Sequence, residues 1–388
     1  MAEYFPIRTS VINWACDRIG LAYSDISKKN DLKNLAKETN GIVKLTMKQL
    51  ESLSHVLRYP LFYLMLDKPV ESLDILPIND FRTINGKEAK TSIDLCEQID
   101  FCKAQQDWFI DFVKENSIEP FEYISKFTIK DNPEIAGHKI RNLIKISNIT
   151  TNKTKEFYKK LKEKIEEQYI LVCSSKVLKN TTHRLSISEF RGYALTDKYA
   201  PLIFINGNDS INAQIFTLCH ELGHICLGVS GISDVSLKNN RIIEKWCNNF
   251  AASILMPLDM ISLDFKKANN LNDFLESSQD KYHVSINALV IRLYNLNLIT
   301  KKEFEIQWEK AEKLYVSYLN SLKEQRKGSD AKGDYYKTAA SRLSSLLTRS
   351  IIASTAVGNT TFREASNLLG FSSVNTFDSF IKKQKVFQ

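Results

Sequence analysis

The sequence predicts an α+β protein: a mainly helical chain with one small β-sheet domain, flanked by helical N- and C-terminal modules. Three observations support this prediction. Helix-type spacing of apolar residues prevails over most of the 388 residues. Short β-type runs gather only between residues 168 and 206. A further helical pattern, which contains His-Glu-x-x-His at 220–224, follows the last of these runs.

The composition is that of an ordinary globular protein, with 43% hydrophobic and 25% charged residues. At about 150 residues per domain, the length predicts two or three domains. No apolar run approaches the ~18 to 20 residues that cross a bilayer, and no secretory signal is recognisable. We therefore expect a cytoplasmic protein with no membrane partner. Its seven scattered cysteines, without a CxxC pair, favour reduced thiols over a disulfide framework or a cysteine-based zinc site.

The net charge of +8 is unevenly distributed. Residues 1–82 hold 11 basic and 10 acidic side chains, whereas residues 323–388 hold 11 basic and 5 acidic ones. A solvated basic face explains this excess better than contact with nucleic acid or an acidic partner.

Residues 1–66 are predicted to form a domain of several short helices. The clearest begins after Thr46, because Gln49 stands at capping-box spacing and leucines then recur at helical intervals. Pro60 is expected to kink or break that helix. Such a set fits a helix-turn-helix-like bundle and equally fits any other small helical bundle.

The remaining boundaries follow from proline, glycine and charge. Residues 67–83 read as a linker that contains Pro69 and Pro77, and 84–165 as a helical connector. Residues 166–300 form the predicted sheet domain, with β-type runs at 169–173, 190–195 and 202–205, and 301–388 form a helical C-terminal module.

The pattern at 220–224 indicates a metal site. On a helix, His220 and His224 lie on one face and are able to bind one ion together. Glu221, next to His220, is placed to reach a water at that ion as general base. Asp209 or Ser210 is expected to cap this helix, and Gly228 to end it.

Catalytic zinc keeps three protein ligands, so a third is required. Glu244 lies 20 residues after His224 on a second predicted helix, where Ala251 and Ala252 allow close approach to the first. We predict Glu244 as the third ligand of one Zn²⁺ per chain, although Mn²⁺ and Fe²⁺ also suit this ligand set. Asn248, one turn later, is expected either to hold a ligand imidazole by a hydrogen bond or to be a plain packing residue.

These residues predict hydrolysis of an amide bond: zinc acidifies its water and polarises the carbonyl, and Glu221 moves the proton to the leaving amine. Candidate donors to the oxyanion are Tyr193, Arg191 and His183, each of which is more simply explained as structural. The run 200–206 is expected to be an edge strand that pairs with an extended peptide.

At these residues the sequence resembles the ImmA/IrrE family of zinc metallopeptidases. The resemblance rests on GYAL (192–195), YAPLIFIN (199–206), FTLCHELGH (216–224) and EKWCNNFAA (244–252) with LMP (255–257), in matching order and spacing. It implies a zincin-like metallopeptidase domain over 166–300, with His220, His224 and Glu244 as ligands and Glu221 as general base. VSINALVIRL (284–293) is similar to the segment that closes that domain.

The whole chain is similar to a longer subgroup of the family with an N-terminal Xre-type helix-turn-helix region. Its marks here are TMKQL (46–50), DFRT (80–83) and GDYYK (333–337). The resemblance implies a regulatory role: cleavage of a specific repressor or partner protein, or membership of a toxin–antitoxin-like pair.

Two functions therefore stay open. The first is a zinc-dependent endopeptidase for a specific regulatory protein. The alternative is a DNA-binding transcription regulator or antitoxin-like protein that uses the zincin fold as a scaffold. For DNA, the expected recognition helix at 32–39 offers Lys33, Asn34 and Lys37 but no arginine. A degenerate helix-turn-helix that grips a protein is an equal interpretation, and the sequence does not fix the oligomeric state.

Overall fold

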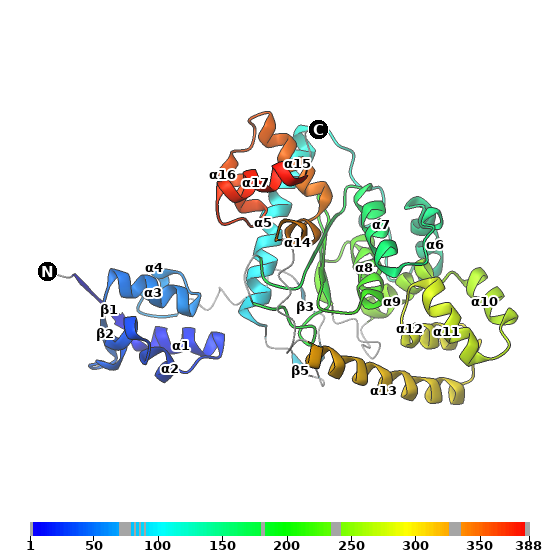
Figure 1. Cartoon of the computed structure of the whole chain (residues 1–388), viewed down its shortest axis with the longest axis horizontal. Helices are drawn as coiled ribbons and strands as arrows, with labels where there is room; N and C mark the ends of the chain where they lie inside the picture. Colours follow the sequence, from blue (N-terminus) through cyan, green and yellow to red (C-terminus); the bar gives the residue numbers. More distant parts are fainter. Residues whose placement is uncertain are drawn as a thin grey trace. The chain divides into compact units, whose positions relative to one another are not determined.

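The computed structural model confirms the α+β class: most elements are helices, and the sheets are small (Figure 1). It describes residues 3–69, 79–80, 83–84, 87–88, 91–179, 183–233, 242–325 and 335–384. The chain divides into two compact units. Unit 1 comprises residues 1–77 and 90–97, and unit 2 comprises 78–89 and 98–388.

Unit 1 is not purely helical, which corrects the prediction for residues 1–66. Strands β1 (Tyr4–Arg8) and β2 (Ile42–Thr46) pair antiparallel, with Ile7 opposite Val43. The two strands are far apart in sequence, so no hairpin turn in the sequence indicates their pairing. The helices of the unit are α1 (Thr9–Ile19), α2 (Tyr23–Ser27), the 3₁₀ helix η1 (Asn30–Ala36), α3 (Met47–Leu57) and α4 (Leu61–Leu64).

The capping box at Thr46 is confirmed. The Thr46 side chain accepts from the Gln49 amide, and the Gln49 side chain accepts from the Thr46 amide, so α3 starts with both donors satisfied. The predicted break is also confirmed, because α3 ends at Leu57 and α4 begins directly after Pro60. Leu50, Leu53 and Leu57 lie in the buried core of unit 1.

The expected recognition helix at 32–39 is wrong. Lys33 and Asn34 lie in η1, which Leu32 interrupts with a non-helical φ of −116°, and Lys37 follows its end. A 3₁₀ stretch of this length tightens the backbone and does not present the continuous face of an α-helix. The Asn34 amide donates to the Gln49 side chain at 3.1 Å, so it serves an internal contact.

Unit 2 contains a five-stranded mixed sheet in the order β3-β9-β7-β8-β6. Strands β6 and β8 are parallel, β7 runs antiparallel to both β8 and β9, and β3 is parallel to β9. The bounds are β3 (Asn79–Asp80), β6 (Leu171–Ser175), β7 (Gly192–Leu195), β8 (Leu202–Asn206) and β9 (Gly231–Ser233). A separate two-stranded ribbon pairs β4 (Thr83–Ile84) with β5 (Lys87–Glu88).

Helices account for most of the remainder of unit 2. They are α5 (Ile93–Glu115), whose first residues belong to unit 1, α6 (Pro133–Leu143), η3 (Ile146–Asn148), α7 (Thr154–Glu166), α8 (Ile211–Leu227), α9 (Ile242–Leu255), α10 (Leu258–Lys267), α11 (Leu271–Tyr282), α12 (Ile286–Asn295), α13 (Lys301–Gln325), α14 (Tyr335–Arg342), α15 (Ser345–Ala356), α16 (Phe362–Leu368) and α17 (Val374–Gln384).

The sheet separates two helices. Side chains alternate along β7, so Gly192 and Ala194 face α8, whereas Tyr193 faces α5. Helix α8 packs on β7 and β8 and against α9, and these elements share one large buried core. That core positions α8 and α9 as a rigid pair.

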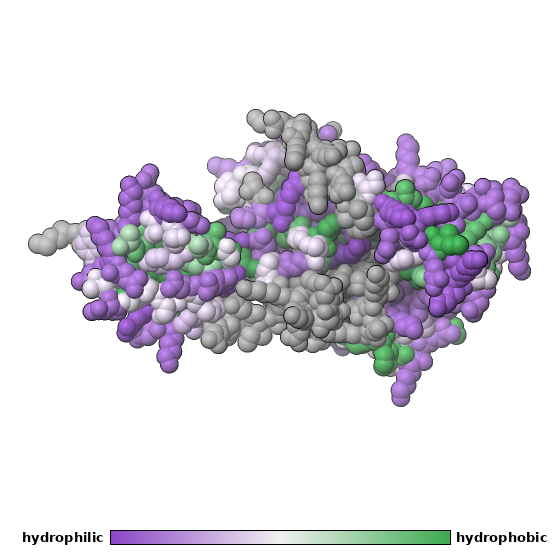
Figure 2. Space-filling view, turned by 90° about the horizontal axis from the view of Figure 1, so that it is seen from below, coloured by the Kyte–Doolittle hydropathy of each residue, from purple (hydrophilic) through white to green (hydrophobic). Residues whose placement is uncertain are grey.

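None of the helices in the described part of the chain has both the length and the apolar composition to span a membrane. On the face seen in Figure 2, hydrophilic side chains surround scattered apolar ones.

Candidate metal centre

Helix α8 carries both histidines and is buried on all sides from Gln214 to Cys226. The Ser210 side chain caps it by accepting from the Ala213 amide, and Gly228 ends it in the left-handed conformation, with a φ of 73°. A helix that is apolar all round and has firm ends is held in one place by the core. Its few polar side chains therefore take fixed positions.

Helix α9 brings Glu244 to the two histidines. The helices approach closely where α8 has Gly223: a Cβ there would lie 3.1 Å from a Phe250 ring carbon and 3.3 Å from the Cys247 sulfur. Such contacts are tighter than ordinary van der Waals distances, so glycine permits this crossing. The crossing sets how far Glu244 stands from α8.

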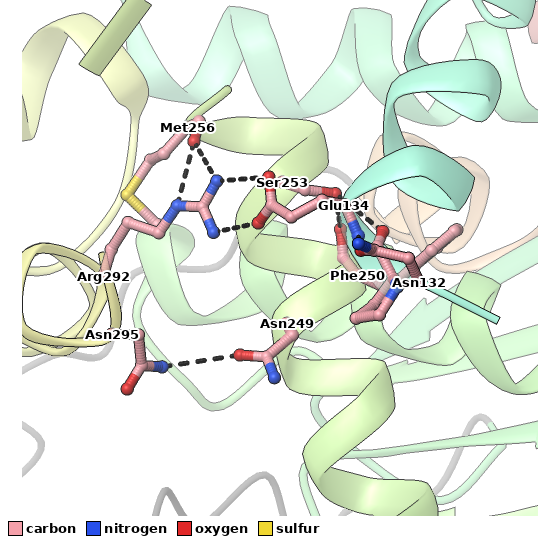
Figure 3. A network of polar contacts seen from close by, with 9 residues as sticks. Asn132, Glu134, Asn249, Phe250, Ser253, Met256, Arg292 and Asn295 are labelled. Carbon is pink, nitrogen blue, oxygen red and sulfur yellow. Dashed lines mark hydrogen bonds and ion pairs between the residues drawn. The ribbon is translucent and has the colours of Figure 1, made fainter. Parts of the chain in front are cut away.

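The C-terminal end of α9 is anchored by Arg292 of α12, which is 3% exposed (Figure 3). Its guanidinium donates twice to the Met256 carbonyl, at 2.9 and 3.1 Å, and forms an ion pair with Glu134 of α6. Because the last carbonyls of a helix lack intrahelical donors, a buried arginine satisfies them well. This network ties α9 to α6 and α12.

The three predicted ligands meet at one point. His220 Nε2 lies 3.2 Å from one Glu244 oxygen, His224 Nε2 lies 3.1 Å from the other, and the two Nε2 atoms are 3.2 Å apart. Tetrahedral ligands at 2.0–2.1 Å from zinc are separated by about 3.3 Å. The observed spacing therefore fits one tetrahedral zinc ion bound by two imidazoles and a carboxylate.

Asn248 lies beside His220, as one of the two sequence interpretations expects. Its side-chain oxygen is 3.0 Å from His220 Nδ1. If Nδ1 donates this hydrogen bond, the imidazole is held with the lone pair of Nε2 toward Glu244 and His224. Asn248 is thus placed to orient a ligand.

The electrostatics of the site favour ligation. Burial lowers the pKa of His224, so this imidazole is neutral near pH 7. Burial alone would raise the pKa of Glu244, but the charge of His220 and the hydrogen bonds from both imidazoles outweigh it and lower the pKa to about 2. A neutral imidazole and an ionised carboxylate are the forms that bind a metal.

Sequence reasoning missed Cys247, whose sulfur lies within 4.8 Å of donor atoms of both histidines. Its position three residues after Glu244 on a helix was the available signal. The carboxylate oxygens of Glu244 lie 3.2 and 3.1 Å from the Nε2 atoms of His220 and His224, and burial raises the pKa of the Cys247 thiol. Both observations favour Glu244 over Cys247 as the third ligand.

Gly192 of β7 is a second residue that sequence reasoning did not single out. A Cβ at this position would lie 3.0 Å from Glu221 Oε1 and 2.7 Å from the Thr217 methyl carbon. The backbone of β7 thus packs directly on the carboxylate of the predicted general base. A lone glycine inside a β-type run was the signal for such a close approach.

The three expected oxyanion donors lie in different surroundings in the structure. Tyr193 is wrong for this role, because it is on the other face of the sheet and its hydroxyl donates to the Gln98 carbonyl on α5. Arg191 forms an ion pair with Asp209, just before the start of α8. His183 is exposed on the segment that precedes β7. For Arg191 and His183 the role stays a prediction.

The expected edge strand is also wrong. The run 200–206 forms β8, which lies between β7 and β6 and is paired on both sides. All five residues of β8 are buried, as in a central strand.

A helix with His-Glu-x-x-His under a small mixed sheet, with a glutamate from a second helix, defines a zincin-like metallopeptidase domain. Residues 165–294 match the family model of the IrrE N-terminal-like domain, Peptidase_M78. This part of the chain is thus similar to the ImmA/IrrE family of metallopeptidases. Residues 343–383 match a domain of unknown function, DUF8813. The search of curated proteins gave no match.

Proposed function

We propose that the chain is a zinc-dependent endopeptidase that cleaves a specific regulatory protein. The observation that carries this proposal is the complete set of His220, His224 and Glu244 at tetrahedral spacing, with Glu221 beside it. A domain that used this fold only as a scaffold would have no need of Glu221. The modules outside residues 165–294 support a narrow, regulatory substrate range.

Each residue has a distinct task in this mechanism. His220, His224 and Glu244 hold the metal, and Asn248 orients His220. When bound, zinc acidifies a water and polarises the substrate carbonyl. Glu221 accepts the proton of the attacking water and donates it to the nitrogen of the leaving amine. Burial of Glu221 against β7 fixes the direction from which it does so.

The test is a trap with Glu221→Gln in the native cell. This substitution keeps the size of the side chain and leaves the three ligands in place, but removes the base. Proteins captured on the variant are then incubated with the wild-type chain, with and without zinc. We expect a partner that the variant holds and the wild type cuts only with zinc.

Glu244→Ala, which loses a ligand, is the matched negative control and should leave the partner intact. A partner that binds the wild type and Glu221→Gln equally, and that zinc-loaded wild type never cuts, would refute the peptidase proposal. It would favour the alternative, a partner-binding regulator or antitoxin-like protein.

A second candidate function is DNA binding by unit 1, where an open hollow of about 580 Å³ is lined partly by Lys37, Lys44 and Asn40. Both lysines are exposed, and lysine and asparagine side chains suit phosphate and base contacts. A gel shift on the protein's own promoter DNA tests this function. DNA binding should weaken as the salt concentration rises, and it should also weaken in the double variant Lys37→Ala, Lys44→Ala. The absence of any shift at low salt would refute DNA binding.

A further inference from the structure

Two buried cysteines lie together on the side of the sheet away from the metal centre. Cys173 stands in β6, in register with Phe204 of β8, which is in register with Tyr193 of β7. Side chains in such a row project from one face of the sheet, and that of Tyr193 meets α5. Cys102 lies on α5 and is 1% exposed, and Cys173 is 3% exposed. Neither cysteine has a part in the proposed hydrolysis.

The sulfur of Cys102 accepts a hydrogen bond. The Gln98 side chain donates to it, with Nε2 and Sγ 3.5 Å apart. The Gln98 amide is held this way round, because its oxygen accepts from the Lys179 backbone amide at 3.3 Å. An acceptor position with a fixed N–H donor is the one that suits a thiolate.

The sulfur of Cys173, in contrast, donates a hydrogen bond. Its thiol donates to the Gln105 side chain, with Sγ and Oε1 3.8 Å apart. The Gln105 amide is also fixed, since its nitrogen donates to the Leu368 carbonyl at the end of α16 at 2.7 Å. Cys173 therefore keeps its proton in the resting protein, while its neighbour is arranged to lose one.

The electrostatics of the pair agree with these two roles. Burial alone would raise the pKa of Cys102. Hydrogen bonds from Cys173, Tyr193 and Gln98 outweigh burial and lower this pKa. The hydrogen bond to Cys102, together with burial, raises the pKa of Cys173 well above its ordinary value. Because the thiolate is the nucleophilic form of cysteine, Cys102 is the nucleophile of the pair.

A small cavity gives the pair access to a reactant. It has a volume of about 30 Å³ and is lined by both cysteines, by Lys179, which is exposed, and by Arg342, which is partly buried. One water needs about 10–15 Å³ by this measure, so the cavity has room for about two. Hydrogen peroxide, with its two oxygen atoms, fits this space, whereas an aryl hydroperoxide is too large.

We propose that hydrogen peroxide oxidises Cys102 and that Cys173 converts the product to a disulfide between α5 and β6. The Cys102 thiolate attacks one peroxide oxygen: an S–O bond forms, the O–O bond breaks, and the released hydroxide takes up the proton that Cys102 had lost, which gives water. The Cys173 sulfur then attacks the sulfenic acid, and its proton leaves with the displaced hydroxide as a second water. Two thiols and one peroxide thus give one disulfide and two waters. The inference does not depend on the proposed peptidase function.

Cys219, on α8, supplies an internal control. It is fully buried, and burial raises its pKa to about 12. Compared with a thiol at the ordinary value of 9.0, it has ~10³-fold less thiolate at neutral pH, of which the greater nucleophilicity of a more basic thiolate restores roughly 15- to 30-fold. Cys102 should therefore react at least about 30-fold faster than Cys219.

The test exposes the reduced, zinc-loaded full chain to hydrogen peroxide. Remaining thiols are blocked with iodoacetamide, and linked peptides are identified by mass spectrometry after cleavage at glutamate, which separates Cys96 from Cys102 at Glu97. We expect a link between Cys102 and Cys173, unchanged zinc content and a reduced Cys219. Cumene hydroperoxide carries the same O–O bond on a group too large for the cavity and should give no link.

Two variants separate the roles of the two cysteines. In Cys173→Ser, the sulfenic acid on Cys102 has no thiol to resolve it and should be captured by dimedone. In Cys102→Ser, Cys173 should stay reduced at the same dose of peroxide. The matched control is Cys96→Ser, which removes a half-buried cysteine of the same helix and should form the link at the wild-type rate. Zinc content and melting curves show that each variant is folded.

A folded wild-type chain in which peroxide oxidises Cys96 and leaves Cys102 reduced would overturn the proposal. A link that forms equally fast with cumene hydroperoxide would also overturn it, since the oxidant would then enter by opening of the core and not through the cavity. Both results come from the wild-type chain, so they hold even where a variant fails to fold. Oxidation of Cys173 at the same rate in Cys102→Ser would overturn the assignment of Cys102 as the nucleophile.

Discussion

Replacement of Gly192 by alanine tests the contact between strand β7 and Glu221. The new Cβ would lie 2.7 Å from the Thr217 methyl carbon, 3.0 Å from Glu221 Oε1 and 3.0 Å from the Phe204 carbonyl oxygen, whereas ordinary contact begins at 3.4 Å. The overlap is thus about 0.7 Å with Thr217 and 0.4 Å with Glu221. The Phe204 carbonyl belongs to the central strand β8, which is fixed by pairing on both sides. The two α8 side chains must therefore yield.

The substitution should lower both the stability of the protein and its kcat. Overpacking of a buried site lowers the free energy of unfolding by about 1–3 kcal/mol. A misplacement of about 1 Å at a catalytic group costs ~10²-fold in rate, so a 0.4 Å shift of Glu221 should cost roughly tenfold in kcat. Zinc content should not change, because the three atoms nearest to the new methyl group belong to Thr217, Glu221 and Phe204 and not to the three ligands.

A second substitution separates these effects. Thr217→Ser deletes the methyl carbon that meets the new Cβ most closely, and leaves Glu221 untouched. In the double variant we expect the melting temperature to recover while kcat, measured on the partner found with the trap, stays low. Recovery of kcat together with stability would refute a specific role of the Glu221 contact. Full activity in a destabilised Gly192→Ala variant would refute it as well.

Three further outcomes test the metal centre. Asn248→Ala should weaken zinc binding by about 10–100-fold in a chelator competition, whereas Asn249→Ala on the same helix should leave it unchanged; equal effects would contradict the orienting role. Glu244→Ala should weaken zinc binding more than Asn248→Ala does, as metal analysis of the dialysed proteins would show. In the metal-free protein, the lowered pKa of His224 predicts loss of stability as pH falls below 6.5, since the unfolded chain takes up the proton first. The pKa of Glu244, lowered from 4.5 to about 2, predicts a further loss between these values, and Glu244→Gln should remove this second step from melting curves measured against pH.

Two of the three predicted ligands could be brought together from sequence because their geometry is local. His220 and His224 share a face through the helical repeat alone, and the cap at Ser210 and the end at Gly228 are short-range signals. Glu244 needs one more step, the packing of α9 on α8. The sequence suggested Ala251 and Ala252 for that close approach, whereas in the structure Gly223 of α8 lies against Phe250 and Cys247.

The failures concern residues whose role depends on a partner strand. Tyr193 and Gly192 are neighbours, and the sequence shows that they face opposite sides of a strand but not which side meets α8. The run 200–206 reads as a buried strand, but its place inside the sheet depends on the later pairing of β6 and β7 with it. Strand order is a non-local property, and composition carries little of it.

The two-residue strand β3 is the extreme case of this dependence. Asn79 and Asp80 are poor strand formers that follow a proline, so their own propensity favours a turn or loop. Their extended pairing is set by β9, about 150 residues later in the chain.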